Sequence, residues 1–303
     1  MYAVEEVYKD GWSDSLNQLV KDFYPTIDRF VTFLTTSSIF IGIMGFLVPY
    51  FAFLLYGIPH NYCLLASSFL LTFAIYSHNK LTDLEEDAVN VPERAGFIEE
   101  NKKTVIITLS AAYVAALLLA FLINPFAIVI ILFPIFCGLV YSIKIAGFRL
   151  KDITGIKNVV VSLPWAVIGA FLPAAVYLDE LILIPLVFYF FFVKLIINTV
   201  LFDVRDIEGD RLAGVKTVPS VIGRERTQTL LLVLNSTFIP WLLLTYCWGF
   251  FHQYLLVFAF IILYGYWYIL YFCSREKIGK SLDLLVDGEW IPVAALATAV
   301  VAL

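Results

Sequence analysis

Long apolar segments alternate with short polar connections along almost the whole chain. Runs long enough to cross a bilayer as helices fall at residues 31–56, 61–78, 104–123, 125–142, 157–177, 181–202, 227–246, 249–272 and 287–303. A helix needs about 20 apolar residues to span the hydrocarbon core. The pattern therefore predicts an all-α membrane protein with nine transmembrane helices. The last is short for a full span, so we expect it to be tilted or partly interfacial.

The composition agrees with this class of protein. Hydrophobic residues make up 61% of the 303 residues and charged residues 15%, and the mean hydropathy is +0.88. A soluble core cannot bury that much apolar surface. The start of the chain has no pattern of a removable signal peptide. We expect one transmembrane domain over residues 1–303, with residues 1–30 as a cytoplasmic N-terminal segment, and no nucleic-acid partner.

The positions of the basic residues predict the orientation. Every Lys and Arg except Lys194 lies in the N-terminal segment or in alternate connections between the predicted helices. The remaining connections, near Pro59, Pro125, Asp179 and Phe251, contain no Lys or Arg. The positive-inside rule makes the basic side cytoplasmic. We therefore expect a multi-pass protein of the cell membrane with a cytoplasmic N-terminus.

Two acidic motifs stand at the ends of apolar runs on this predicted cytoplasmic side. The first contains Asp83 and Asp87 and the second contains Asp206 and Asp210. Each pair is spaced i, i+4 and shares one helix face, where like charges repel unless a cation lies between them. Either motif alone could be a solvated helix end. Their matched spacing and side favour a site for metal ions and, through them, for phosphate.

The two motifs also occupy equivalent places in an internal repeat. A shift of 123 residues (206 − 83, and 210 − 87) places Asp83 on Asp206 and Asp87 on Asp210. The same shift lays the first four predicted helices over the next four, each in the same direction. This predicts two parallel four-helix repeats plus a ninth helix, with the two carboxylate pairs facing one cavity.

The chemistry of these residues favours magnesium. Mg²⁺ prefers oxygen ligands and is usually held by one or two carboxylates together with substrate phosphates. Four aspartates from two helix ends could hold such ions around a diphosphate, and the metal would assist cleavage of a carbon–oxygen bond. Basic residues on the same side could complete a diphosphate site or could only mark the cytoplasmic face and contact lipid headgroups. They are Arg94, Lys144, Arg149, Lys151 and Lys157.

Neighbouring polar residues extend both motifs. Asn79 lies one turn before Asp83 and could bind substrate or metal without adding charge, or could be a plain helix-end residue. Asp203 could join the second cluster or could pair with Arg205 or Lys80.

Lys194 and Asn198 lie inside the sixth predicted helix. A lysine at that depth usually faces a polar cavity, although it could be a structural lysine paired with an acid.

With these motifs the sequence resembles the UbiA superfamily of intramembrane prenyltransferases. Asn79-x-x-x-Asp83-x-x-x-Asp87 looks like the first motif of that family, and Asp206-Ile-Glu-Gly-Asp210-Arg211 looks like the second. Tyr141-Ser142 and Asn90-x-Pro92-Glu93-Arg94 are also similar to family patterns. Many members have a proline after Arg94 and after Tyr141-Ser142, and this chain does not, which leaves the acceptor open.

The resemblance implies an activity and a set of partners. A Mg²⁺-dependent enzyme would transfer an isoprenyl group from a prenyl diphosphate, such as dimethylallyl, geranyl or a longer one, to a lipophilic acceptor, and release diphosphate. Asp83, Asp87, Asp206 and Asp210 would bind the metal, and Tyr141 could stabilise an allylic cation or anchor the membrane interface. Substrate would also contact Asn79, Arg94, Ser142, Lys144, Lys151, Lys194, Asn198 and Asp203.

Several alternatives stay open at this stage. A transporter fits an intramembrane lysine and a parallel repeat, although transporters place their substrate site near the midplane. A non-catalytic lipid-binding protein would have no use for two complete aspartate pairs. The acceptor itself could be an aromatic quinone precursor, a glycerol-phosphate lipid or another isoprenoid.

Overall fold

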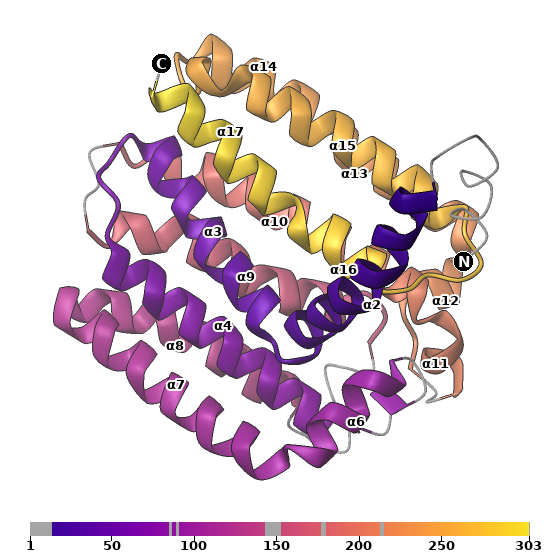
Figure 1. The fold of residues 1–303 in the computed structure, drawn as a ribbon. Coiled ribbons are helices and arrows are strands. Elements are labelled where there is room, and N and C mark those ends of the chain that lie inside the picture. Colours follow the sequence, from indigo (N-terminus) through magenta and orange to yellow (C-terminus); the bar gives the residue numbers. More distant parts are fainter. Residues whose placement is uncertain are drawn as a thin grey trace.

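The computed structural model describes residues 14–84, 87–88, 91–142, 153–176, 180–212 and 215–302, with the backbone alone for 14–24, 139–142 and 212. Regular structure within these residues is entirely helical. Figure 1 shows the long helices, which pack as one bundle except for the first of them. They are α2 (Asp14–Thr36), α3 (Ile39–Tyr56), α4 (Tyr62–Thr82), α7 (Lys102–Ile123), α8 (Pro125–Ser142), α9 (Ile156–Ala174), α10 (Leu183–Arg205), α13 (Arg224–Ser236), α14 (Phe238–Cys247), α15 (Leu255–Cys273) and α17 (Trp290–Ala302).

Short helices complete the fold between these long ones. They are α6 (Pro92–Glu100), α11 (Ile207–Leu212), α12 (Val218–Ile222), η2 (His252–Tyr254), α16 (Ser281–Val286) and η3 (Asp287–Glu289). Figure 1 shows α6, α11 and α12 gathered at one end of the bundle. Both acidic motifs are at this end, because α6 follows the first motif and α11 carries part of the second.

The prediction of an all-helical protein with many spans is confirmed. Seven segments of the described chain are long and apolar enough to cross a membrane. They cover residues 39–56, 102–123, 156–174, 183–205, 224–247, 252–273 and 281–302. The helix predicted at 61–78 is not among them, and in the one predicted at 125–142 the apolar stretch with described side chains is Pro125–Gly138. Helix α4 is less apolar because it contains serines such as Ser67 and Ser68, which donate hydrogen bonds to the carbonyls of Ala116 and Gly45.

The predicted short last span is wrong. Helix begins at Ser281, before the expected start at 287, and the continuous segment α16–η3–α17 has 22 residues, enough to cross a membrane. Its first part is polar, with Asp283 and Asp287, and apolar periodicity alone places the start too late. The last helix therefore extends into the end of the bundle where the acidic motifs lie.

The first predicted span, residues 31–56, is interrupted. Helix α2 ends at Thr36 and α3 begins at Ile39, because Ser38 adopts a left-handed backbone with φ 67°. The last carbonyls of a helix have no partner within it. Here the carbonyls of Thr35 and Thr36 accept hydrogen bonds from the Lys80 ammonium, at 2.9 and 3.0 Å. The break thus fixes the end of α2 against the first acidic motif.

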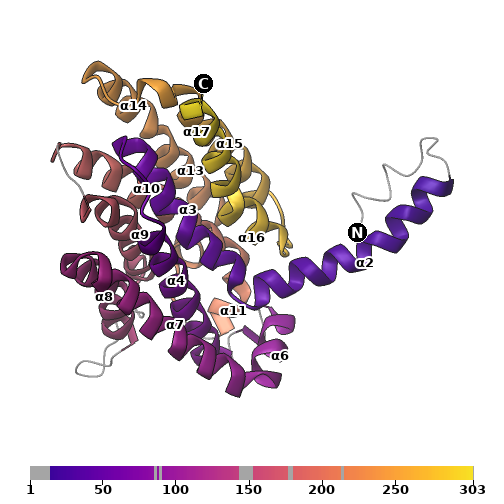
Figure 2. The same cartoon turned by 60° about the vertical axis from the view of Figure 1, so that its left-hand side comes forward.

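Helix α2 extends away from the bundle, as Figure 2 shows. The predicted N-terminal segment, residues 1–30, therefore includes a helix from Asp14, and residues 25–30 of this helix are exposed. Residues 1–13 lie outside the described part of the chain.

Aromatic side chains fill the interior around α10. Phe51, Phe190, Trp241, Phe258 and Trp290 are all buried. The ring of Phe190 lies 5.2 Å from Phe258 and 5.5 Å from Trp241, measured between centroids. Aromatic pairs at such distances add to the energy of burial. The core therefore holds α10 rigidly, and α10 carries the second acidic motif at its C-terminal end.

Helices α9 and α10 approach each other closely at Gly169. A Cβ atom at this position would lie 2.6 Å from the Phe191 ring, so only glycine allows the contact. The two helices run in opposite directions, and the start of α9 lies beside the end of α10. This packing brings Lys157 and Asn158 to Asp203.

Candidate functional site

A cavity of about 230 Å³ opens at the end of the bundle where the motifs lie, between α3, α4, α9, α10 and the start of the last span. Aromatic residues on its wall include Phe40, Tyr76, Trp165, Phe202 and Trp290. Basic residues on its wall are Lys80, Arg94, Lys157 and Arg205. Acidic residues on its wall are Asp203, Asp206, Asp283 and Asp287. The cavity thus combines an apolar, aromatic part with a densely charged part.

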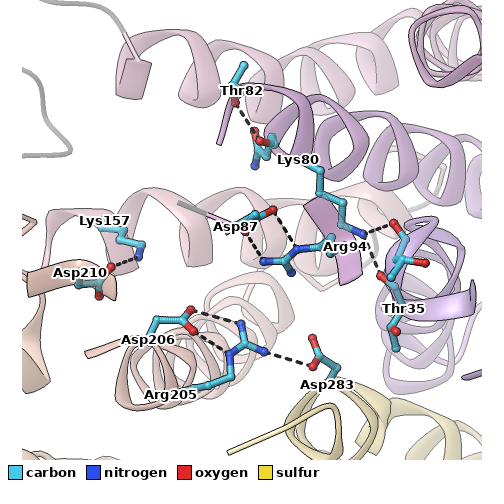
Figure 3. A network of polar contacts seen from close by, with 12 residues as sticks. Thr35, Lys80, Thr82, Asp87, Arg94, Lys157, Arg205, Asp206, Asp210 and Asp283 are labelled. Atoms are coloured by element: carbon cyan, nitrogen blue, oxygen red, sulfur yellow. Dashed lines mark hydrogen bonds and ion pairs between the residues drawn. The ribbon is translucent and has the colours of Figure 1, made fainter. Parts of the chain in front are cut away.

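The second motif lies where α10 ends. Asp206 is the C-cap residue of α10, and its carboxylate accepts hydrogen bonds from its neighbour Arg205 at 2.8 and 3.2 Å. Arg205 also donates to the Asp283 carboxylate at 3.2 Å. Figure 3 shows the guanidinium of Arg205 between these two acids. An arginine thereby links the second motif to the last span.

Asp203 lies one turn deeper in α10 and is buried. Its carboxylate pairs with the Lys157 ammonium at 3.0 Å and accepts a hydrogen bond from the Asn158 amide at 2.7 Å. Lys157 also lies 4.0 Å from Asp210. The expected alternative, a pair between Asp203 and Arg205 or Lys80, is therefore wrong, because α9 brings Lys157 closer.

Asp210 follows in α11, outside the spanning helices. Burial raises the pKa of its carboxyl to about 6; Lys157 acts in the opposite direction, and the charges of Asp203 and Asp206 raise the pKa further. One oxygen of Asp210 is buried and has no hydrogen-bond partner. Carboxylates that repel one another in this way favour the binding of a cation, because the cation removes the repulsion.

The first motif lies at the end of α4. Asp83 is the half-buried C-cap residue of this helix, and its amide donates to the carbonyl of Asn79 at 2.9 Å. Asp87 is buried and accepts a hydrogen bond from Arg94 Nε at 2.9 Å, with a second, shorter contact to the same guanidinium. Figure 3 shows this two-pronged pair. Asp87 itself lies outside the cavity wall, but it holds Arg94, which lines the wall.

The structure brings some of the predicted site residues together and separates others. Arg94, Asn198, Asp203 and Asp206 line the cavity, whereas Asp83, Asp87 and Asp210 lie outside its wall. The Asn79 side chain is exposed. Two further predicted residues end helix α8, where only the backbone is described, namely Tyr141 and Ser142. Lys144 and Lys151 lie outside the described residues.

Lys194 lies in a closed polar network inside the bundle. Its ammonium pairs with the Glu289 carboxylate at 2.8 Å, and both side chains are 0% exposed. It also donates to the Tyr268 hydroxyl at 2.8 Å, and that hydroxyl donates to Asn198 at 3.1 Å. Lys194 itself does not line the cavity. Of the two alternatives for this lysine, a polar cavity or a structural pair with an acid, these contacts agree with the structural pair.

Several site residues were missed by the sequence reasoning. Arg205, Lys80 and Asn158 were noted only in passing or not at all, and Asp283 and Asp287 were not considered. The sequence does contain a signal for Asp283 and Asp287. They lie at the start of an apolar run and have the same i, i+4 spacing as the other acidic pairs. The aromatic residues Tyr76 and Trp165, joined by a hydrogen bond of 3.1 Å, had no such signal.

The donor set fits a metal ion that shares its ligands with a phosphate. Within the described ranges, no group of three acidic, histidine or cysteine side chains is arranged to hold a metal by itself. Mg²⁺ seldom needs such a cage, since it keeps waters and takes one or two carboxylates plus substrate oxygens. Of the four aspartates that the motifs predict for this role, Asp206 lies on the cavity wall, and Asp83, Asp87 and Asp210 lie outside it.

The fold is an all-helical membrane fold, and its cavity is lined by charged and aromatic residues near two acidic helix ends. These features are those of an enzyme that acts within the membrane. Residues 57–286 match the model of the UbiA prenyltransferase family, and the chain belongs to this family. It is therefore a prenyltransferase-family enzyme, which sets aside the transporter and the non-catalytic lipid-binding protein. No curated protein matches the sequence.

Solved structures share the fold. A UbiA homolog from Archaeoglobus fulgidus bound to GPP and Mg²⁺ is 19% identical, with a TM-score of 0.68 over 90% of this chain and 100% of that one. The apo UbiA homolog from Aeropyrum pernix K1 is 16% identical, with a TM-score of 0.69 over 88% of this chain and 99% of that one. A digeranylgeranylglyceryl phosphate synthase is 16% identical, with a TM-score of 0.54 over 91% of this chain and 94% of that one. At these identities the likeness concerns the fold.

Proposed function

We propose that the protein transfers an isoprenyl group from a prenyl diphosphate to a lipophilic acceptor within the membrane, in a reaction that requires Mg²⁺ and releases diphosphate. The observation that carries this proposal is the cavity, where Asp206 of the second motif lies in one space with basic and aromatic side chains. The first motif borders this space through Arg94, which pairs with Asp87. The A. fulgidus homolog, of the same fold, is bound to GPP and Mg²⁺. Family membership supports the same reaction class.

In this proposal the charged part of the cavity binds the diphosphate. Asp83, Asp87, Asp206 and Asp210 hold Mg²⁺, which neutralises the leaving diphosphate. Lys80, Arg94, Lys157 and Arg205 supply charge-assisted hydrogen bonds to the diphosphate oxygens. All four already lie on the cavity wall with their side chains held by acids or carbonyls. Substrate therefore meets cations that need little reorganisation.

The apolar part shelters the prenyl group. Tyr76 and Trp165 face each other edge-on, 6.1 Å between centroids, and Trp290 lies on the same wall. Aromatic faces stabilise a nearby cation, so these rings stabilise positive charge that develops on the allylic carbon. An apolar wall also keeps water from the cation. Tyr141, which the family motif indicates for this role, stays a prediction.

Binding of the diphosphate should depend on the metal. In titration calorimetry we expect geranyl diphosphate to bind at least ~10-fold more weakly with a chelator than with Mg²⁺, a loss of about 1.4 kcal/mol or more. The reason is that the clustered carboxylates repel a diphosphate until metal is present. Geraniol, which has no phosphate, is the control and should bind alike in both buffers. Equal affinity of geranyl diphosphate in both buffers would disprove the metal bridge.

The finer topology is also a proposal. We infer that α4 and the helix from Pro125 cross the membrane beside the seven clear spans, which gives nine helices as two parallel repeats of four plus a ninth. The whole chain is one domain in this view, and the cavity opens to the cytoplasm. Support comes from the basic residues, which cluster at the end of the bundle where the cavity lies.

Thiol labelling tests this orientation. In a variant without the four native cysteines, single cysteines at Glu100 and Glu208 should react with a membrane-impermeant maleimide only from the cytoplasmic face. Both side chains are exposed; Glu208 lies within the second motif, and Glu100 ends α6, the helix that follows the first motif. A cysteine at the exposed Glu180, in a connection without Lys or Arg, should react only from the opposite face. Labelling of Glu100 and Glu208 positions from opposite faces would mean that the two motifs cannot share one diphosphate.

A further inference from the structure

The last span brings a third acidic pair to the cavity. Asp283 in α16 and Asp287 in η3 are spaced i, i+4, and both line the cavity wall. Neither belongs to the two acidic motifs. They enter from a helix that follows both motifs in the chain, so their place at the cavity results from tertiary packing.

The two acids differ in their contacts. Asp283 accepts the hydrogen bond of 3.2 Å from Arg205, which also binds Asp206. Asp287 accepts no hydrogen bond and forms no ion pair with the residues that the structure describes. It lines the same cavity as the basic Arg205 and the aromatic Tyr76. Asp287 is therefore a carboxylate available to a bound molecule.

The charges around the cavity disfavour an anionic acceptor. Arg94 is held by Asp87, Arg205 by Asp206 and Asp283, and Lys80 by two backbone carbonyls. The remaining hydrogen-bond donors and positive charge of these residues would be used by the bound diphosphate. A second anion next to Asp287 would meet a like charge in a medium of low dielectric constant, and this repulsion disfavours its binding. A hydroxyl group at the same place donates a charge-assisted hydrogen bond instead.

We propose, on the basis of the prenyl transfer inferred above, that the acceptor is a neutral lipophilic molecule whose hydroxyl group donates to Asp287. The carbon–oxygen bond between C1 of the prenyl group and the diphosphate breaks, and the diphosphate keeps the electron pair. The acceptor oxygen, or a ring carbon that this oxygen activates, forms the new bond to C1. In the second case the proton on that ring carbon then moves to the acceptor oxygen, which restores the aromatic ring and its hydroxyl group. The hydroxyl proton passes to the Asp287 carboxylate. Asp287 is thus a catalytic base that also selects the acceptor.

Two matched pairs of acceptors test the selection. The first pair is 4-hydroxybenzyl alcohol and 4-hydroxybenzoate, and the second is 1-O-hexadecylglycerol and its 3-phosphate. Each is offered to the full-length protein in detergent with geranyl diphosphate and Mg²⁺, and products are measured by mass spectrometry. In at least one pair the neutral member should be prenylated at least ~10-fold faster than the charged member. Preference for the charged member of each pair, or no transfer to either neutral probe while geraniol is still released by hydrolysis, overturns the proposal.

Asp287→Asn tests the role as a base. This change keeps the shape but cannot accept the proton, and general bases typically contribute 10²-fold or more. We expect the ratio of transfer to hydrolysis to fall by ~10²-fold, and the preference for the neutral acceptor to shrink. Glu276→Gln, at an exposed acid in the connection that precedes the last span, is the control and should behave as the unchanged protein.

The outcomes separate this proposal from the proposed function. A ratio that Asp287→Asn leaves unchanged overturns the role of Asp287 while Mg²⁺-dependent diphosphate binding still stands. A variant whose only defect is a higher Mg²⁺ requirement makes Asp287 a metal ligand and likewise overturns it. Loss of Mg²⁺-dependent binding in the unchanged protein instead refutes the prenyl-transfer function itself.

Discussion

Alanine at Asp83, Asp87, Asp206 or Asp210 is expected to lower prenyl-transfer turnover by ~10²-fold or more in each case, the scale of losing a preorganised electrostatic contact. Each carboxylate neutralises part of the metal charge that binds the leaving diphosphate. Turnover is measured as diphosphate release with geranyl diphosphate and Mg²⁺ in saturating amounts. Glu225→Gln, an exposed acid at the start of α13, is the control and should retain full activity.

The pairs should act as units. Because two carboxylates on one helix end serve a shared ion, a double variant such as Asp206→Ala/Asp210→Ala should lose less activity than the product of its single losses. All variants should fold, as judged by helical content and elution as one species, because these aspartates lie at helix ends and not among the buried aromatic residues. Near-normal turnover of both single variants in one motif would mean that this motif is only a solvated helix end without a role in catalysis.

Removing one partner of the buried Lys194–Glu289 pair should destabilise the fold strongly. In Lys194→Met the Glu289 carboxylate, which is 0% exposed, loses its cation. An uncompensated charge of this kind typically costs about 3–5 kcal/mol. The midpoint of thermal unfolding in detergent, with helical content as the signal, is expected to fall clearly below that of the unchanged protein. Glu289→Gln should give a loss in the same direction.

Two comparisons identify the cause of that loss. Lys194→Met/Glu289→Met removes both charges. Its loss of stability should be smaller than the summed losses of Lys194→Met and Glu289→Met, because no charge is left without a partner. Lys280→Met removes an ion pair of 2.6 Å between this half-buried lysine and the exposed Glu93. Exposed pairs contribute about 1 kcal/mol or less, so this variant should unfold almost as the unchanged protein does. A Lys194→Met variant as stable as Lys280→Met would contradict the buried-charge explanation.

Apolar periodicity predicts the helices but not where they stop. The spans at α7, α9 and α10 lie close to their predicted ranges because each begins or ends at clear polar residues. The break at Ser38 was not predictable, since Ser37 and Ser38 lie within an apolar run and only packing shows the left-handed turn. The last helix begins at Ser281, earlier than predicted, because its polar first turns face a cavity and not lipid.

Helix-end charges predict part of the site. The i, i+4 spacing predicts Asp206 and Asp87 as candidate residues, because it concerns neighbours on one helix. In the structure Asp206 lines the cavity and Asp87 pairs with Arg94 at its wall. The partners of these acids were less predictable. Arg94 is close in sequence to Asp87, but Lys157 reaches Asp203 through the contact of α9 with α10, which depends on Gly169 and Phe191. The aromatic wall follows from packing among several helices and has no local signature.

The last span has a consequence for biosynthesis. Residues of α16, η3 and α17 complete the cavity wall with Asp283, Asp287 and Trp290, and the ribosome makes them after every other described helix. Insertion proceeds along the chain, so the diphosphate end can form before the wall that shields the prenyl group does. A nascent chain halted before Ser281 would expose bound prenyl diphosphate to water. Closure of the cavity wall is thus the last step of membrane insertion, and it requires the complete last span.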